Sequence, residues 1–176
     1  MRSARIGREI EMMAQDPIPG IIVWPRESIE LEVLDVIMKG PEESPYENGT
    51  FKLEVRFPKR YPLDPPLVKF CTPVYHPNVD DQGRICLDSL KMPPKGGWLP
   101  ALNVTQVLLQ IRLLLSEPNP DDPLMVDISM LFKDHYETFH KNAQEHTRTH
   151  AKATTDARAT DENPPPSKRI RIENVA

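Results

Sequence analysis

The chain has 176 residues, a net charge of −4 and a hydrophobic fraction of 39%, which fits a single soluble domain with a full core. The acidic balance argues against direct nucleic-acid binding, because proteins that bind nucleic acids normally carry a basic surplus. No apolar run approaches the roughly 20 residues that span a bilayer, and no apolar stretch near the N-terminus could serve as a secretory signal, so we expect an intracellular protein without a membrane partner.

An amphipathic helix is expected over residues 2–15. Ile6, Ile10 and Met13 recur there at i, i+4 and i+7, which is the spacing of one helical face. Arg2, Arg5 and Arg8 lie on the opposite side, where they form either a solvated face or a docking surface for an acidic partner.

Four extended segments follow the helix. The clearest is residues 50–57, where apolar and charged side chains alternate. The others span residues 21–24, 29–38 and 67–71. Because the connections hold only about ten residues, they have no room for crossover helices. An α+β fold is therefore expected, with a four-stranded antiparallel meander after the N-terminal helix.

A long irregular stretch over residues 72–100 separates the strands from the last helices. Stretches of this length in compact domains are usually functional or disordered. Tyr75, Ile85 and Trp98 make this one too apolar for disorder. We therefore expect an ordered loop that carries function.

Further helices are expected in the C-terminal half. The first is strongly periodic and ends near Glu117, and its apolar face consists of Val104, Val107, Leu108, Ile111 and Leu115. Asp122 can cap a second helix with Pro123 at its first position. A last helix is expected from about residue 134 to 151.

The composition shifts to Ala, Thr, Asp and Pro from residue 153. This shift predicts a folded domain over residues 1–152 and a flexible tail over residues 153–176. The run Lys168–Arg171 follows three prolines and is typical of a nuclear import signal, although a solvated basic tail explains it as well. We expect the protein in the nucleus and also in the cytoplasm.

Two cysteines, Cys71 and Cys86, are too few for a four-thiolate zinc site or a disulfide framework. Cys71 follows Phe70 on an expected strand and is interpreted as a core residue. Cys86 lies in the segment YHPNVDDQGRICLDSL, just after a glycine-containing turn. A free cysteine is often only a small hydrophobe, but this setting would hold the sulfur at the surface.

A thiol hydrolase is the obvious enzymatic alternative, because a nucleophilic thiolate needs a histidine base. The nearest histidine, His76, is held in a tight turn, and aspartates such as Asp88 would raise the thiol pKa. His146 and His150 have the i, i+4 spacing of a metal pair, but the HExxH pattern is absent. We favour a solvated helix face there and expect no metal site.

The order and spacing of several motifs resemble the ubiquitin-conjugating enzyme family. The motifs are Tyr61-Pro62-Leu63-Asp64-Pro65-Pro66, His76-Pro77-Asn78, Cys86 eight residues later, Trp98-Leu99-Pro100 and the run Pro118–Leu124. The similarity covers roughly residues 2–152 and implies the family's α+β fold. The insertion Lys91–Gly96 is similar to that of the family's type-T members, which work with the Fanconi anaemia ligase in DNA crosslink repair.

This resemblance implies a catalytic centre. Cys86 matches the thiol that accepts ubiquitin from the activating enzyme as a thioester. Asn78 is similar to the asparagine that stabilises the oxyanion or holds the active-site loop, and Asp122 to the residue that orients the incoming lysine. The supporting residues are expected to be His76, Pro77, Asp88 and Leu124. No bound cofactor is implied, because the upstream activating enzyme consumes the ATP.

The implied partners are ubiquitin, the ubiquitin-activating enzyme, a RING-type ligase such as the Fanconi anaemia ligase, and a protein substrate lysine. The shared docking surface is expected at Arg5, Arg8, Arg60, Leu63, Trp98, Leu99 and Pro100. Leu63 stands where the family usually has a larger aromatic residue, and Leu99 where type-T members are basic. Lys91, five residues from Cys86, is expected to be modified by the enzyme itself.

The implied function is transfer of ubiquitin to a substrate lysine, as monoubiquitination in DNA crosslink repair. Two alternatives lie within the same family. One is a catalytically inactive adaptor, against which the presence of Cys86 and Asn78 argues. The other is a conjugating enzyme for a different ubiquitin-like modifier, which the sequence leaves open.

Overall fold

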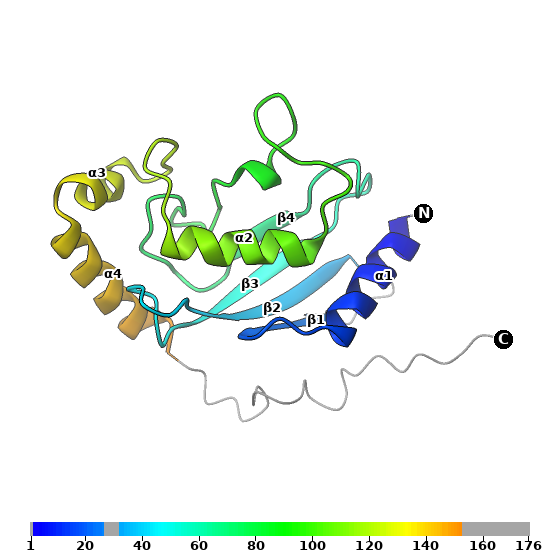
Figure 1. The fold of residues 1–176 in the computed structure, drawn as a ribbon, viewed down its shortest axis with the longest axis horizontal. Helices are drawn as coiled ribbons and strands as arrows, with labels where there is room; N and C mark the ends of the chain where they lie inside the picture. The colour runs from blue at the N-terminus through cyan, green and yellow to red at the C-terminus, as the bar shows by residue number, and fades with distance from the viewer. Residues whose placement is uncertain (1, 27–31, 153–176) are drawn as a thin grey trace.

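The computed structural model describes residues 2–26 and 32–152, and Figure 1 shows how their helices and strands are arranged. In chain order the elements are α1 (Arg2–Gln15), β1 (Ile21–Pro25), β2 (Val33–Lys39), β3 (Thr50–Arg56), β4 (Leu67–Phe70), the 3₁₀ helix η1 (Asp88–Leu90), α2 (Val104–Ser116), α3 (Val126–Asp134) and α4 (Tyr136–His150). The predicted tail over residues 153–176 lies outside the described residues, as does the nuclear import signal within it.

The strands form one antiparallel sheet in the order β1-β2-β3-β4, which confirms the predicted meander. Val36 of β2 pairs with Leu53 of β3, and Val55 of β3 pairs with Val68 of β4. All four side chains are buried, so the register brings one apolar face toward the core. β2 is described from Val33 onward, and residues 29–31 of the predicted strand lie outside the described part.

Cys71 is not the core residue that the sequence analysis expected, because its side chain is exposed. β4 buries Val68 and Phe70 and exposes Leu67 and Lys69. Successive side chains of a strand point to opposite faces, so residue 71 continues the outward row. The alternation within β4 contained this information, whereas the adjacent phenylalanine pointed to the wrong face.

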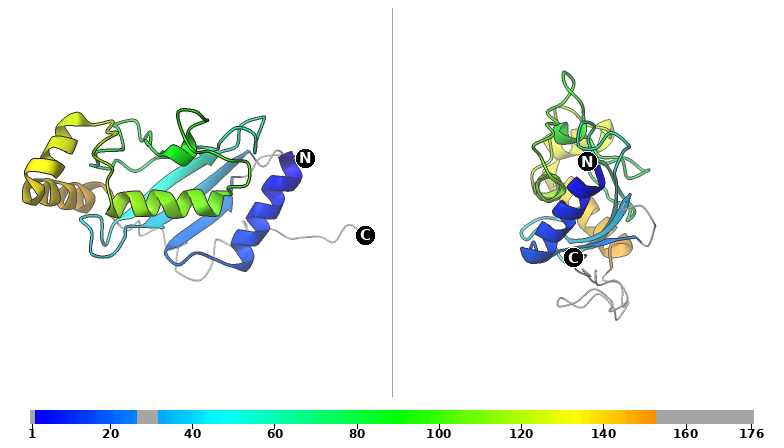
Figure 2. Two further views of the ribbon diagram at one scale, coloured as in Figure 1. Left: turned by 45° about the horizontal axis from the view of Figure 1, so that its top comes forward. Right: turned by 90° about the vertical axis from the view of Figure 1, so that its right-hand side faces the viewer.

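Helix α2 lies across one face of the sheet, with α1 beside one end and α3 and α4 beyond the other (Figures 1 and 2). Val104, Val107, Leu108, Ile111 and Leu115 of α2 join the buried side chains of the sheet in one core cluster. A capping box starts the helix: the Asn103 side chain accepts the Gln106 N–H, and the Gln106 side chain accepts the Asn103 N–H. Most of the sequence motifs lie in the irregular residues that precede α2, and the run Pro118–Leu124 follows it.

The C-terminal helices are present, but the second begins later than predicted. α3 starts at Val126 with Met125 as its N-cap, so Asp122 does not cap a helix and Pro123 does not begin one. The backbone N–H groups of Leu124 and Met125 donate instead to the Pro77 carbonyl. This contact holds the segment before α3 against the turn at His76-Pro77-Asn78. The Asp122 carboxylate is not used as a helix cap and can contact other groups. No helix within residues 2–26 and 32–152 is long and apolar enough to cross a membrane.

Candidate active site

A tight turn precedes the segment that carries Cys86. The Asp80 carboxylate accepts hydrogen bonds from two backbone N–H groups of the turn, and Gly83 adopts a φ of +78° within it. A Cβ at Gly83 would lie 1.9 Å from the Phe70 carbonyl oxygen, so only glycine allows this approach to β4. The turn leads the chain back to Asn78, whose carbonyl accepts the Cys86 N–H at 2.9 Å.

Asn78 is fully buried and ties this turn to the segment before α3. Its amide nitrogen donates to the carbonyls of Asn119 at 2.7 Å and Asp122 at 3.0 Å. Its amide oxygen accepts the Asn119 N–H at 2.9 Å. Both amide hydrogens are therefore occupied, and in this state Asn78 positions the loop that carries Asp122.

The Cys86 thiol lies in a triangle of hydrogen bonds with Asp122 and Lys91. Its Sγ is 3.0 Å from Asp122 Oδ2 and 3.1 Å from Lys91 Nζ, and Lys91 Nζ is 2.7 Å from the same carboxylate oxygen. The thiol is half-buried and Asp122 is exposed. A second protein can therefore reach both groups from solvent.

The charges in this triangle set its protonation states. Burial raises the pKa of the Cys86 thiol, and the Asp122 carboxylate raises it further, while the Lys91 ammonium acts in the opposite direction. Pairing with Lys91 lowers the pKa of Asp122, and pairing with Asp122 raises the pKa of Lys91. At neutral pH the site therefore holds a neutral thiol, a carboxylate and an ammonium ion.

His76 cannot serve as a base for this thiol. Its buried ring accepts the Asn78 N–H at Nδ1, at 2.9 Å, and its Nε2 lies 2.8 Å from the Leu114 carbonyl, to which it must donate. Burial lowers the pKa of His76 to about 4, so the ring is neutral at physiological pH. With both nitrogens occupied, His76 supports the turn, which argues against the thiol hydrolase alternative.

The predicted solvated face on α4 is only partly correct. His150 is exposed, but His146 is half-buried, and burial lowers its pKa. Among the residues that the structure describes, no group of three or more His, Cys, Asp or Glu side chains could hold a metal ion.

The chain matches a family model, and its relatives are similar over most of their length. Residues 5–147 match the model described as "Ubiquitin-conjugating enzyme". The chain belongs to the ubiquitin-conjugating enzyme family. The ubiquitin-conjugating enzyme E2 T of Homo sapiens is 52% identical over 151 residues, which cover 86% of this chain and 76% of the relative. That of Bos taurus is 50% identical over 155 residues, or 88% and 79% of the two chains. Ubiquitin-conjugating enzyme E2 13 of Schizosaccharomyces pombe is 46% identical over 147 residues, or 84% and 96%.

Family membership confirms the recognition and the fold inferred from the motifs, and it makes this protein a ubiquitin-conjugating enzyme. It implies ubiquitin, an activating enzyme, a ligase and protein substrates as partners. In this conjugating enzyme the three residues predicted to be catalytic, Cys86, Asn78 and Asp122, lie together, and Lys91 completes the group.

His76 acts through its ring, whereas two other predicted supporting residues act through their backbones. Besides Pro77, whose carbonyl holds the segment before α3, Asp88 uses its carbonyl to accept the N–H groups of Lys91 and Gly97. The Asp88 side chain itself is exposed. Leu124 is 41% exposed and stands two residues after Asp122, so it can contact a bound partner.

Most residues predicted for the docking surface are exposed in this enzyme. Leu63 and Leu99 expose 57% and 58% of their surface, and the side chains of Arg8, Arg60 and Pro100 are exposed too. The two leucines that depart from the family pattern are therefore available to a partner.

Trp98 was wrongly assigned to that surface. Only 1% of it is exposed, and its indole N–H donates to the Pro62 carbonyl at 2.9 Å. The buried ring thus joins the loop of Leu99 to the turn of Leu63. Arg5 is also less accessible than expected, because its half-buried guanidinium donates to the Leu102 carbonyl at 2.8 Å.

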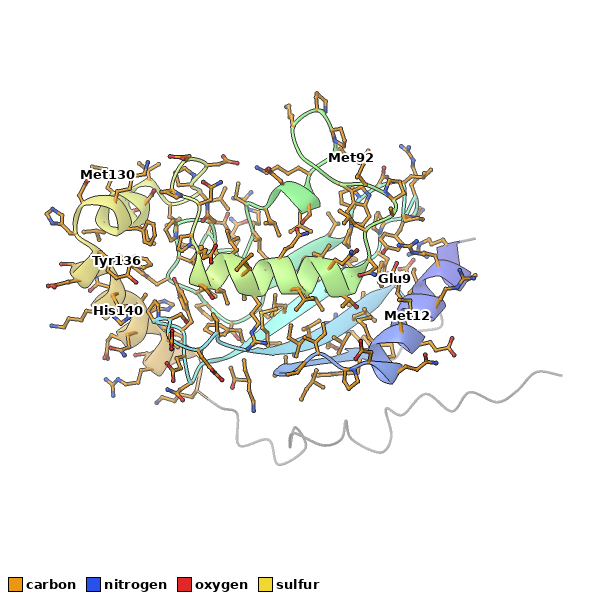
Figure 3. All side chains as sticks on the ribbon, viewed as in Figure 1. Glu9, Met12, Met92, Met130, Tyr136 and His140 are labelled. Carbon is orange, nitrogen blue, oxygen red and sulfur yellow. The ribbon has the colours of Figure 1, made fainter. Side chains whose placement is uncertain are left out.

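Glu9 is a structural residue of this surface that the sequence analysis did not single out. Its buried carboxylate accepts hydrogen bonds from Arg5, from the Tyr61 hydroxyl at 2.6 Å and from the Val104 N–H at 2.8 Å. Figure 3 shows Glu9 beside the start of α2, where a negative charge complements the helix dipole. The sequence contained a signal for this role, because Glu9 is an acidic residue three positions after Ile6 and so lies within the apolar stripe of α1.

Proposed function

We propose that this enzyme accepts ubiquitin from the activating enzyme as a thioester on Cys86 and transfers it to a substrate lysine together with a RING-type ligase. The observation that carries the proposal is the half-exposed Cys86 thiol, 3.0 Å from the exposed carboxylate of Asp122. A lysine side chain arrives as an ammonium ion and must lose a proton before it can attack. A carboxylate beside the sulfur can hold that lysine and ease the loss of its proton.

The charging step suits a thiol that is not strongly acidic. The Cys86 sulfur attacks the carbonyl carbon of the activating enzyme's thioester, a new C–S bond forms, and the old C–S bond breaks to release the other thiol. Because the incoming and leaving groups are similar, the exchange needs little stabilisation beyond docking, and a more basic thiolate is also the better nucleophile. The raised pKa of Cys86 is therefore compatible with charging.

Parallel charging reactions distinguish this function from the two family alternatives. Purified protein is incubated with ATP and either ubiquitin or another ubiquitin-like modifier, each with its own activating enzyme. We expect an adduct with ubiquitin that a reducing agent removes. An adduct only with another modifier would support the second alternative, and no adduct with any modifier would identify an inactive adaptor.

We further propose that the enzyme monoubiquitinates its substrate in DNA crosslink repair, with the Fanconi anaemia ligase as partner. The support is the type-T insertion at Lys91–Gly96 and about 50% identity to relatives named ubiquitin-conjugating enzyme E2 T. The exposed Leu63 and Leu99 depart from the family pattern on the docking surface, so binding of the purified enzyme to this ligase is the step to measure first.

A nuclear site of action predicts an effect of the C-terminal tail. Deleting residues 164–176, which contain the run Lys168–Arg171, should shift a fluorescent fusion toward the cytoplasm, because import receptors read such basic runs. Deleting a tail segment of similar length that spares this run, residues 153–163, is the control. An unchanged distribution after the first deletion would remove the support for import by this signal.

Self-modification is expected at Lys91 when no ligase substrate is present. Lys91 Nζ lies 3.1 Å from Cys86 Sγ, and such proximity strongly accelerates attack on a thioester. Since only the neutral amine can attack and pairing raises the pKa of Lys91, the yield should rise with pH. Mass spectrometry of a ligase-free reaction should find the adduct at Lys91. Adducts confined to distant lysines would contradict this expectation.

A further inference from the structure

Lys91 contacts both groups that an acceptor lysine has to reach. Its ammonium is 2.7 Å from Asp122 Oδ2 and 3.1 Å from Cys86 Sγ. In the proposed reaction, an acceptor amine must approach the carbon bound to this sulfur while the carboxylate holds it. The enzyme's own lysine therefore occupies the position that a substrate lysine needs.

Backbone contacts fix Lys91 at the base of the insertion. The Lys91 N–H donates to the Asp88 carbonyl at 3.0 Å, the Trp98 N–H donates to the Lys91 carbonyl at 3.1 Å, and the Gly97 N–H donates to the Asp88 carbonyl at 2.9 Å. A Cβ at Gly96 would lie 2.3 Å from the Lys91 Cβ. Only glycine at position 96 therefore allows the two ends of the insertion to approach each other this closely. Figure 3 shows Met92 on the loop that projects from this base. Lys91 thus stays at the base, beside Cys86, while the rest of the insertion projects away.

We propose that Lys91 is an internal competitor that an acceptor lysine must displace from Asp122 before it can attack the thioester. This inference rests on the proposed function of Cys86. Once the acceptor holds Asp122, its amine nitrogen attacks the thioester carbonyl carbon. A C–N bond forms, the C–S bond breaks, the sulfur leaves as the Cys86 thiolate, and the amine proton passes to Asp122 or solvent. The ammonium form of Lys91 has no lone pair and only competes, whereas the small neutral fraction gives the slow self-modification described above.

This competition favours a substrate lysine that a ligase holds at the site over a free amine in solution. An acceptor can bind Asp122 only while Lys91 does not occupy it. The apparent affinity for the acceptor is therefore the intrinsic affinity multiplied by the fraction of enzyme in which Asp122 is free. Lys91 and Asp122 are partly exposed, with side-chain exposures of 33% and 59%. Exposed ion pairs shift equilibria by about two- to fivefold. A lysine held in place by a ligase has a high effective concentration and overcomes this barrier, whereas a free amine in solution does not.

The test is single-turnover discharge of the preformed ubiquitin thioester over a range of free lysine concentrations. Lys91→Ala should lower the half-saturating lysine concentration by about two- to fivefold, and this concentration is the readout of the competition. Lys91→Arg keeps the cation but removes the amine that can be modified, so it should behave like the native enzyme. Lys95→Ala, in the same exposed loop, is the matched control and should also be native-like.

A second measurement needs no ubiquitin and so separates this inference from the proposed function. In a Cys71→Ser background, the pH midpoint of Cys86 alkylation should rise in Lys91→Ala, because the thiolate loses its neighbouring cation, and stay near native in Lys91→Arg. An unchanged midpoint in Lys91→Ala would overturn the placement of Lys91 at the sulfur. Equal half-saturation in the native enzyme and Lys91→Ala, or an equal fall in Lys91→Arg, would overturn the competition. A native enzyme that cannot be charged would instead overturn the function of Cys86.

Discussion

Replacement of Cys86 by alanine is expected to abolish ubiquitin charging. The thioester requires a sulfur at this position, and the neighbouring groups cannot replace it. Lys91 is a protonated amine paired with Asp122, and both nitrogens of His76 are occupied. The fold should survive, because the side chain is only half-buried and the Cys86 N–H keeps its bond to the Asn78 carbonyl. Non-reducing electrophoresis after incubation with activating enzyme, ATP and ubiquitin measures the loss.

Two further variants make this result specific to one thiol. Cys86→Ser should trap ubiquitin as an oxygen ester that reducing agents do not remove and that releases ubiquitin more slowly. Cys71→Ala should charge like the native enzyme, since Cys71 is an exposed residue that follows the outer row of β4. A reducible adduct on Cys86→Ala, or loss of charging in Cys71→Ala, would contradict the assignment.

Asn78→Ala and Asp122→Ala are expected to charge normally but to release ubiquitin to lysine slowly. Charging needs docking and a correctly placed sulfur, and the contact of Asn78 with Cys86 is a backbone hydrogen bond that alanine preserves. Discharge is harder, because the amine must lose a proton while negative charge builds on the carbonyl oxygen. Loss of one oxyanion-hole donor typically costs about 10²–10³ in rate, and on that scale we expect losses of about 10 to 10³ in each variant.

The geometry indicates how the two residues depend on each other. The Asn78 amide holds the Asn119 and Asp122 carbonyls, so its loss leaves buried groups unpaired at a cost of about 1–3 kcal/mol and releases the loop of Asp122. If Asn78 acts through this loop, the double variant should be no slower than the slower single variant. Multiplied losses would show that Asn78 acts on the oxyanion independently of Asp122.

Single-turnover discharge to free lysine across pH tests this pair of variants. Higher pH should partly rescue Asp122→Ala, because solution then supplies the neutral amine. Asn78→Ala should gain less, since pH does not restore the position of the loop. An equal loss of charging and discharge in Asn78→Ala would mean that Asn78 holds the whole active-site loop and has no separate role in discharge.

Local patterns in the sequence predicted the elements, because they depend on neighbours along the chain. The 3.6-residue period of α2 and the two-residue period of β3 each gave the correct element and face. Two of the errors arose where a long-range contact overrode a local signal. The Pro77 carbonyl accepts the N–H groups of Leu124 and Met125, so α3 begins at Val126 and not at Pro123. The Pro62 carbonyl accepts the indole N–H of Trp98, whose ring is buried.

The candidate site could be predicted only in part. The resemblance of the motifs to those of the family implied Cys86, Asn78 and Asp122, and proximity to Cys86 along the chain pointed to Lys91. The ion pair between Lys91 and Asp122 joins residues 31 positions apart and follows from the closure of the insertion at Gly96. Sequence spacing alone does not reveal such a pair, because it depends on where two loops meet in space.

The most direct test of the central claim is to map the ubiquitin adduct in a charging reaction. Purified enzyme is charged with ubiquitin, activating enzyme and ATP, digested without reduction, and analysed by mass spectrometry in parallel with a reaction that lacks ATP. We expect the C-terminal peptide of ubiquitin on the peptide that contains Cys86, removable by a reducing agent and absent without ATP. An adduct on Cys71, or no thiol-sensitive adduct, would contradict the proposal that Cys86 carries ubiquitin.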